Sequence, residues 1–386
     1  LYIYDNPTNL YDDWLFFTFN SYEDDSNSNN VEALDMSSSA VAEAWWQRVD
    51  WRAFSSELNT VYYDPDITYS AWPGSTYSAA SFTAANESPD GSGTTRNLTN
   101  AIYVVADDDK GFTGSSGPMG GAAYSSTANG LVDLWDSHTI YNIGSTSVRR
   151  YRVTAVESGG AFADVTFTDL GAITDATQVA TIKQNFANWY QYHRRRYFNL
   201  KGSLASLVTN SPNYRYMLGA INSTSVLVDA PTDNNNLSAH NDNLISSMLE
   251  YGLSQQGTPL RQGLNLAGSY FMSTDSGAPI ENACQLNYTV LMTDGFWNGS
   301  FTSSTIADQD GDTYSQTLAD VADYYYDTDL RSDLANTVPT SSTDSNTQQH
   351  MNTLTLSFGL QGSLTDSNSD GWPDVNGVNL TSSSTS

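Results

Sequence analysis

The chain has 386 residues, of which 43 are Asp or Glu and only 15 are Lys or Arg, so its net charge at pH 7 is −28. Such an acidic surface repels phosphate groups and anionic lipids, which excludes nucleic acids and membrane surfaces as partners. No apolar run is long enough to span a bilayer, while 24 Tyr, 14 Phe and 9 Trp suffice for a folded core.

The rest of the composition is typical of secreted proteins. Only 15% of the residues are charged, and Ser, Thr, Asn, Gly and Tyr are abundant. Cys284 is the single cysteine, so no internal disulfide can form, and its place before an apolar run predicts a packed apolar thiol. We expect an extracellular or cell-surface protein. Because the chain starts directly on a strand-like run, we also expect a trimmed form of something longer.

The chain opens with a predicted strand and a long irregular region. Leu1-Tyr2-Ile3-Tyr4 is an apolar run that a turn at Asp5-Asn6-Pro7 ends. Residues from about 10 to 180 are rich in Ser, Gly, Asn and aromatic residues and show little helical periodicity, apart from a predicted helix at 39–54. Short alternating runs at 150–153 and 163–167 predict small antiparallel strands.

Helices and strands alternate after Asp175, which favours a doubly wound, mostly parallel sheet with the preceding region inserted after the first strand. The strand at 288–292 lacks alternation, which predicts burial on both faces. We expect one domain from 1–10 and 175–361, an aromatic-rich, partly β insertion at 11–174, and an acidic loop and linker at 362–386. The predicted elements are helices at 182–208, 241–251, 259–271 and 315–326 and strands at 214–221, 288–292 and 354–358.

Three polar segments should meet at the carboxyl edge of this sheet, where open parallel sheets bind ligands. Asp5 follows the first strand, Thr258 precedes the helix at 259–271, and Asp294 follows the strand at 288–292. Two carboxylates and a hydroxyl are hard oxygen ligands that suit Mg²⁺ or Ca²⁺. In the competing interpretation, Asp5 and Asp294 only cap neighbouring helix amides.

Long stretches of the chain resemble a known family. With its three metal-edge segments, the chain resembles a von Willebrand factor A-type domain, and more closely the PilY family of type IV pilus tip adhesins. Together the similar stretches cover most of residues 60 to 360. They are YSAWPG at 69–74, KQNFANW at 183–189, TPLR at 258–261, CQLNYTVLMTDGFWN at 284–298, TLADVA at 317–322 with the tyrosines 324–326, and QHM at 349–351.

The resemblance implies a non-enzymatic adhesin or pilus-assembly factor at the pilus tip, which binds minor pilins and contacts host cells or abiotic surfaces. It also implies a carboxy-terminal β-propeller, which would begin beyond Ser386. The aromatic-rich insertion would be the recognition surface, although many of its aromatic residues can simply form its own core. Where the family has Asp-x-Ser-Gly-Ser, this chain has Asp5-Asn6-Pro7-Thr8-Asn9. Pro7 lacks a side-chain oxygen, so we expect weakened Mg²⁺ or Ca²⁺ binding by Asp5, Thr258 and Asp294.

Two further acidic clusters are candidate calcium sites. Asp366, Asn368, Asp370 and Asp374 stand at positions one, three, five and nine of a loop with a Gly at six, as in an EF-hand. Position twelve is a Gly, so the usual bidentate acid is missing and modest affinity is expected. Asp308, Asp310 and Asp312 repeat the alternation with a shifted Gly, and there a solvated acidic loop is an equal alternative.

Two other functional classes stay open. A highly acidic, Ser/Thr/Asn-rich chain is also compatible with a structural subunit that self-associates into an extracellular filament or sheath. A carbohydrate-processing enzyme would need two facing carboxylates in an aromatic cleft. The sequence contains no nucleophile elbow or phosphate-binding loop, and we expect no catalytic activity.

Overall fold

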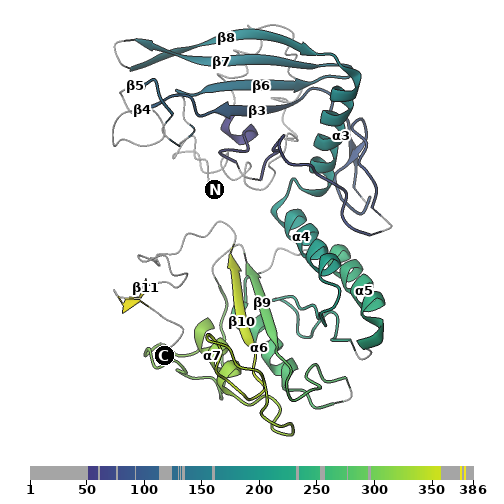
Figure 1. Cartoon of the computed structure of the whole chain (residues 1–386), viewed down its shortest axis with the longest axis vertical. Coiled ribbons are helices and arrows are strands. Elements are labelled where there is room, and N and C mark those ends of the chain that lie inside the picture. Colours follow the sequence, from purple (N-terminus) through teal and green to yellow (C-terminus); the bar gives the residue numbers. More distant parts are fainter. Residues whose placement is uncertain are drawn as a thin grey trace. The chain divides into compact units, whose positions relative to one another are not determined.

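The computed structural model describes residues 51–59, 61–74, 77–91, 93–112, 124–128, 130, 132, 135–158, 161–231, 234–252, 257–275, 277–293, 297–357, 374–375 and 378–379. The chain is a mixed α/β protein that divides into two compact units, Leu1–Leu207 and Val208–Ser386 (Figure 1). The predicted first strand at residues 1–4 lies outside the described residues. In the described part, no helix is both long and apolar enough to cross a membrane.

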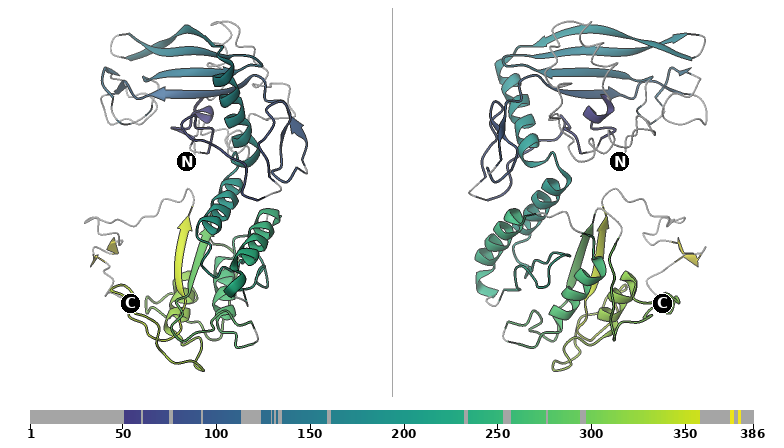
Figure 2. Two further views of the ribbon diagram at one scale, coloured as in Figure 1. Left: turned by 45° about the vertical axis from the view of Figure 1, so that its right-hand side comes forward. Right: turned by 180° about the vertical axis from the view of Figure 1, so that it is seen from behind.

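The amino-terminal unit is organised around a four-stranded antiparallel sheet with the order β3-β6-β7-β8 (Figures 1 and 2). Strands β3 and β6 are the most buried, and Tyr103 of β3 stacks on Tyr141 of β6 with ring centroids 4.6 Å apart. Strands were predicted at 150–153 and 163–167, and the structure confirms both but makes them longer. The strands are β3 (Ala101–Asp107), β6 (Ser137–Ile143), β7 (Val148–Ser158) and β8 (Ala161–Ile173).

Side chains of β7 and β8 form hydrogen bonds with the main chain of β8. The main-chain N–H of Val165 donates to Asp164 Oδ1 and that of Gly171 donates to Asp169 Oδ1, both at 2.8 Å. The main-chain oxygen of Leu170 accepts from Arg150 at 3.3 Å. These bonds satisfy three main-chain groups of β8 by side chains of β7 and β8.

Short elements complete this unit. The pairs β1 (Ala85–Asn86) with β2 (Thr95–Arg96) and β4 (Gly111–Phe112) with β5 (Tyr124–Ser125) are antiparallel. Of the helix predicted at 39–54, only the last four residues are described, as the 3₁₀ turn η2 (Trp51–Phe54).

Helix α3 (Ala176–Tyr192) holds an irregular segment by side-chain amides. Asp175 caps the helix by accepting from the Gln178 N–H. Residues 184, 185, 188 and 191 then form one stripe of Asn and Gln. Asn185 binds the main chain of Ile67 and Tyr69, and Asn188 binds that of Tyr69 and Ala80, at 2.7 to 2.9 Å. Asn185 and Asn188 therefore satisfy main-chain groups of Ile67, Tyr69 and Ala80, which lie outside the described strands.

Helix α3 also makes apolar contacts. Phe186 and Trp189 are buried among aromatic residues that precede the sheet. The ring of Tyr62 lies 4.8 Å from Trp189, and that of Tyr63 lies 4.9 Å from Phe186, centroid to centroid. Tyr62 and Tyr63, two aromatic residues of the region predicted to be an insertion, therefore belong to a core.

The single helix predicted at 182–208 is wrong, because the structure has two helices. α3 ends at Tyr192, and α4 (Arg196–Asn210) begins after a break. At the break, the buried guanidinium of Arg194 donates to the Tyr190 main-chain oxygen, which a helical N–H four residues later would otherwise take. Arg194 also binds the Glu87 main-chain oxygen and stacks on the Tyr190 ring, so the chain leaves the helix there.

The carboxy-terminal unit contains a parallel pair of strands, β9 (Tyr288–Thr293) and β10 (Asn352–Ser357), with Tyr288 opposite Asn352. Helix α6 (Leu260–Phe271) packs against β9, and α7 (Leu318–Asp327) packs against β10 and α6. A Cβ on Gly268 would overlap the ring of Tyr325, so this glycine lets α6 and α7 approach closely. The core consists of Leu264, Phe271, Ile280, Ile306, Val321, Tyr325, Leu330 and Met351.

Several predictions for this unit are confirmed. The helix at 241–251 is α5 (Leu237–Glu250), preceded by the turn η3 (Asn234–Asn236), and the helices at 259–271 and 315–326 are α6 and α7. The strands at 288–292 and 354–358 are β9 and β10. A last pair, β11 (Asp374–Val375) and β12 (Val378–Asn379), is antiparallel.

Three other predictions are wrong. Residues 214–221 form no strand, and only the single bridge between Leu218 and Val228 is present, because turns interrupt the run. Cys284 is exposed, since it lies in a turn before β9 and outside the strand's buried face. β9 is not buried on both faces within the described residues. Leu291 faces the core, whereas the other face of the pair exposes about half of each apolar side chain, namely Tyr288, Val290, Leu354 and Leu356.

Candidate metal centre

The acidic triad at 308–312 sits on a long loop whose two ends are held by one arginine. Arg261, in the first turn of α6, is only 9% exposed and donates to the main-chain oxygens of Gly299 at 2.8 Å and Gln316 at 3.0 Å. Its guanidinium carbon lies 3.7 Å from the ring centroid of Trp297, which is 49% exposed. Residues 299–316 are thus closed into a loop by a buried cation.

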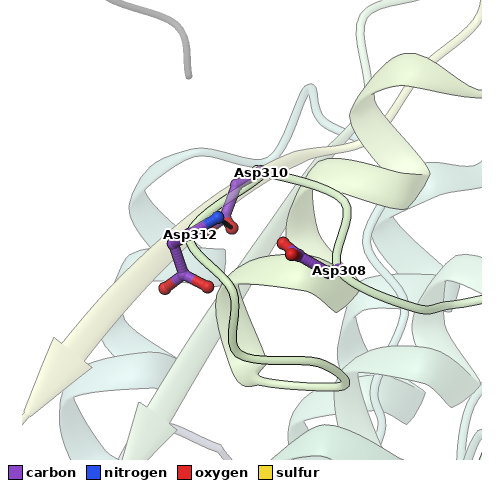
Figure 3. A group of neighbouring side chains, drawn as sticks. All are labelled: Asp308, Asp310 and Asp312. Atoms are coloured by element: carbon purple, nitrogen blue, oxygen red, sulfur yellow. Dashed lines mark hydrogen bonds between the residues drawn. The ribbon is translucent and has the colours of Figure 1, made fainter.

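Within this loop the carboxylates of Asp308, Asp310 and Asp312 converge. They lie on alternate residues of one turn, and each offers an oxygen within 4.8 Å of the others (Figure 3). Local bonds fix the turn, since Asp308 Oδ2 accepts from the Thr313 N–H at 3.1 Å and Asp310 Oδ1 accepts from the Asp312 N–H at 3.2 Å. Gly311 and Thr313 have positive φ angles of 76° and 78°, which lets the chain curl around the carboxylates.

A fourth carboxylate, that of Asp320, accepts hydrogen bonds from the main chain of the loop and of the start of α7. Asp320 is fully buried in the capping box that begins α7, and it accepts from Thr317 N–H at 2.7 Å and Gln309 N–H at 2.6 Å. Burial alone would raise the pKa of Asp320, but these hydrogen bonds outweigh it and hold the pKa below its ordinary value. Asp320 is therefore an anchored anion and not a free ligand.

The electrostatics of the triad favour a cation. Burial and the negative charges of Asp312, Asp320 and Asp308 raise the pKa of Asp310 above its ordinary value. The other oxygen of Asp308, Oδ1, is buried and has no hydrogen-bond partner. A divalent ion among these oxygens would relieve the repulsion, and hard carboxylate oxygens suit Ca²⁺. The triad alone supplies fewer ligands than the six to eight that Ca²⁺ takes, so the main chain and water would have to complete the shell.

The other two candidate sites are only partly described. Thr258 lies before α6, where its N–H donates to Asn298 Oδ1 at 2.7 Å and its oxygen accepts from the Asn298 N–H at 2.9 Å. This reciprocal pair joins the start of α6 to the segment after β9. Asp5 and Asp294 lie outside the described residues. So do Asp366, Asn368 and Asp370, while Asp374 begins β11 opposite Asn379.

Sequence reasoning missed two supports of this site. The pattern Thr317-x-x-Asp320 is a capping signal, and it could have shown that Asp320 is buried beneath the triad. Nothing in the sequence marks Arg261 as the residue that closes the loop, because its partners are main-chain oxygens 38 and 55 positions away.

Comparison with known proteins finds similarity to type IV pilus proteins. The type IV pilus biogenesis factor PilY1 of Pseudomonas aeruginosa strain PAK is 31% identical over 236 residues, which cover 48% of this chain and 20% of that protein. PilY1 of strain UCBPP-PA14 is 26% identical over 369 residues, which cover 82% of this chain and 29% of that protein. The chain thus spans between a fifth and three tenths of the length of these relatives.

No family model and no solved structure matches the chain. The similarity is distributed over most of the sequence, and both PilY1 proteins are described as biogenesis factors. The chain is therefore similar to type IV pilus biogenesis factors of the PilY1 kind.

Proposed function

We propose that this chain is a non-enzymatic adhesin or assembly factor of a type IV pilus, which acts outside the cell at the pilus tip. The observation that carries the proposal is the similarity to PilY1, which extends over 82% of the chain. Minor pilins and a host-cell or abiotic surface are the proposed partners. The strong negative charge is consistent with a role in which nucleic acids and anionic membranes are not bound.

For the carboxy-terminal unit we propose a von Willebrand factor A-like sheet. The parallel pair β9–β10, with α6 and α7 packed against it, supports this fold. The face that carries Val290 and Leu354 is apolar but half exposed. Doubly wound sheets bury both faces, so this apolar face also supports the fold if further parts of the sheet cover it. Residues 1–4 would add a strand beside β9, so that 1–10 and 175–361 form one domain and 11–174 an insertion. Asp5, Thr258 and Asp294 would then form the weakened Mg²⁺ or Ca²⁺ site.

We also propose Ca²⁺ as the ion of the triad at Asp308, Asp310 and Asp312, and of the loop with Asp366, Asn368, Asp370 and Asp374. The convergence of the triad within 4.8 Å supports the first assignment. Calorimetry with Ca²⁺ and Mg²⁺ tests both loops. We expect one Ca²⁺ site to disappear in Asp310→Asn and another in Asp370→Asn, whereas Asp242→Asn on the exposed face of α5 retains both.

The functional proposal is tested by deleting the gene in its source organism and measuring surface pili by electron microscopy and adhesion to cells and glass. We expect both to fall and to return when the wild-type gene is supplied. The purified chain should bind the minor pilins of the same organism in a pull-down. Unchanged pili and adhesion in the deletion strain would contradict the proposal. Ordered polymers of the purified chain alone would favour the filament or sheath subunit instead.

A further inference from the structure

One large aromatic side chain of the carboxy-terminal unit is half exposed although its main chain is firmly held. Trp297 is 49% exposed, and its ring centroid lies 3.7 Å from the guanidinium carbon of Arg261. Because the guanidinium covers one face of the indole, the exposed half belongs to the other face and to the ring edges. Trp297 therefore presents a flat apolar surface to solvent, with a buried cation behind it.

The segment that carries Trp297 is bound to α6 on consecutive residues. Arg261 donates to the main-chain oxygen of Gly299 at 2.8 Å, and Gln262 Nε2 donates to that of Ser300. These bonds fix the backbone directly after the indole. A ligand that contacts the ring therefore finds the segment already ordered, so little conformational entropy is lost on binding.

The polar groups next to this segment are uncharged. Gln262 Oε1 is buried and has no hydrogen-bond partner among the described residues. A buried acceptor without a partner is uncommon in proteins and indicates that a water or a ligand supplies the bond. The Asn298 carboxamide accepts from the Thr258 N–H at 2.7 Å and also carries two donor hydrogens. Residues 297–306 contain no Asp or Glu, although the chain has 43 of them.

This combination fits a neutral sugar better than a protein surface. A pyranose has a face of C–H groups that can pack on an aromatic ring, and hydroxyls at its edge that both donate and accept hydrogen bonds. A stable protein interface buries about 800 Å² on each partner, whereas Trp297 is followed by the small polar residues 298–300. The net charge of −28 disfavours acidic sugars.

We propose that Trp297, with the carboxamides of Gln262 and Asn298, forms a binding site for a neutral pyranose sugar. The sugar ring packs on the exposed face of the indole, and its hydroxyls bond the two carboxamides. The site rests on the proposed adhesin function in one respect, since a neutral glycan is then the surface group that the adhesin contacts. Sugar binding itself is a property of the purified chain and is measured without the pilus.

Fluorine NMR of the full chain labelled with 5-fluorotryptophan tests the site directly. The chain has nine tryptophans, and Trp297→Phe identifies the signal of Trp297 by its loss. Lactose represents the glycans of host cells, whereas chitotriose and cellotriose represent structural polysaccharides. We expect at least one of the three, at about 10 mM, to shift the Trp297 signal and leave the signal of buried Trp72 in place. If none of them shifts it, the proposal is overturned, whether or not any other variant folds.

Variants separate sugar binding from the stacking of Trp297 on Arg261, with saturation-transfer NMR of the sugar as the measurement. Trp297→Ala should lower the association constant at least about tenfold, because the packing surface is removed. Trp297→Phe keeps a ring on the guanidinium but has a smaller face, so the constant should fall about threefold. The matched control is Tyr214→Ala, which removes a tyrosine that is 67% exposed and should bind like wild type. Equal binding by wild type and Trp297→Ala overturns the proposal.

The sugar site and the adhesin function can fail separately. Loss of adhesion in the deletion strain, together with no sugar-induced shift of Trp297, would overturn the sugar site and support the adhesin function. A sugar-induced shift of Trp297, together with unchanged pili and adhesion in the deletion strain, would support the sugar site and contradict the adhesin function.

Discussion

Buried His138 should make the amino-terminal unit unstable in mild acid. His138 is the second residue of β6, is 1% exposed and has the Trp51 ring against it with centroids 4.2 Å apart. Burial lowers its pKa from 6.5 to about 3, and a hydrogen bond to the Asp136 main chain only partly opposes this effect. The folded unit therefore keeps His138 neutral at a pH where the unfolded chain protonates it.

The sign and size of this pH effect follow from the difference between the folded and unfolded pKa of His138. Because the folded pKa lies below the unfolded one, stability is complete above about pH 7 and is lost as the pH falls from 6.5 toward 3. With pKa values of 6.5 and about 3, the free energy of unfolding should decrease by about 2 kcal/mol at pH 5 and about 3 kcal/mol at pH 4, relative to pH 7.5. These losses are a large part of the stability of an ordinary domain.

Urea unfolding of wild type and His138→Gln at pH 7.5, 5 and 4 measures the effect, with tryptophan fluorescence as the probe. Glutamine can still donate a hydrogen bond but does not titrate, so this variant should lose most of the pH dependence of this unit. Ile140→Val, in the same strand, is the control and should lower stability equally at every pH. The reasoning is refuted if His138→Gln destabilises as steeply as wild type between pH 7.5 and 4, or if the His138 ring titrates near 6.5 in the folded chain.

Two further predictions concern side chains that satisfy main-chain groups. Asn188→Ala should lower the free energy of unfolding of the amino-terminal unit by about 2 to 3 kcal/mol, because it leaves main-chain groups of Tyr69 and Ala80 unbonded. Urea unfolding would show this, and a loss below about 0.5 kcal/mol, as expected for exposed Thr181→Ala, would contradict it. Asp320→Asn should lower the free energy of unfolding of the carboxy-terminal unit by about 2 kcal/mol at pH 7, because an amide cannot accept all the hydrogen bonds that this carboxylate accepts. Since its folded pKa is lowered, the deficit against wild type should shrink as the pH falls below about 4, and a constant deficit would disprove the assignment.

The elements that sequence reasoning predicted well are those with strong local signals. α5, α6 and α7 carry apolar residues at helical spacing, and α7 also has its capping residues, so their positions could be read directly. The break between α3 and α4 could not. Apolar residues continue through it with helical spacing, and the break is explained by the bonds of the Arg194 guanidinium to the main-chain oxygens of Tyr190 and of Glu87, 107 residues away.

The candidate site divides in the same way. The alternation of Asp308, Asp310 and Asp312 is visible in the sequence, and the structure brings their carboxylates together. The closure of their loop by Arg261 depends on the tertiary fold and leaves no local pattern in the sequence. For β9, apolar composition suggested burial on both faces, but composition does not specify what covers a face, and Tyr288 and Val290 are half exposed among the described residues.

The hydrogen bonds from α3 to the main chain of residues 67–80 affect how the surface formed by these residues can vary. The amides of Asn185 and Asn188 hold main-chain atoms of residues 67–80, and those atoms are the same in every amino acid except for the missing N–H of proline. Trp72 and Ala80 are buried and the rings of Tyr69 and Tyr77 pack on their neighbours, whereas exposed side chains such as those of Ile67 and Ser70 take no part in these amide bonds. Evolution can therefore rewrite the chemistry of this surface, one exposed residue at a time, on a backbone that keeps its shape.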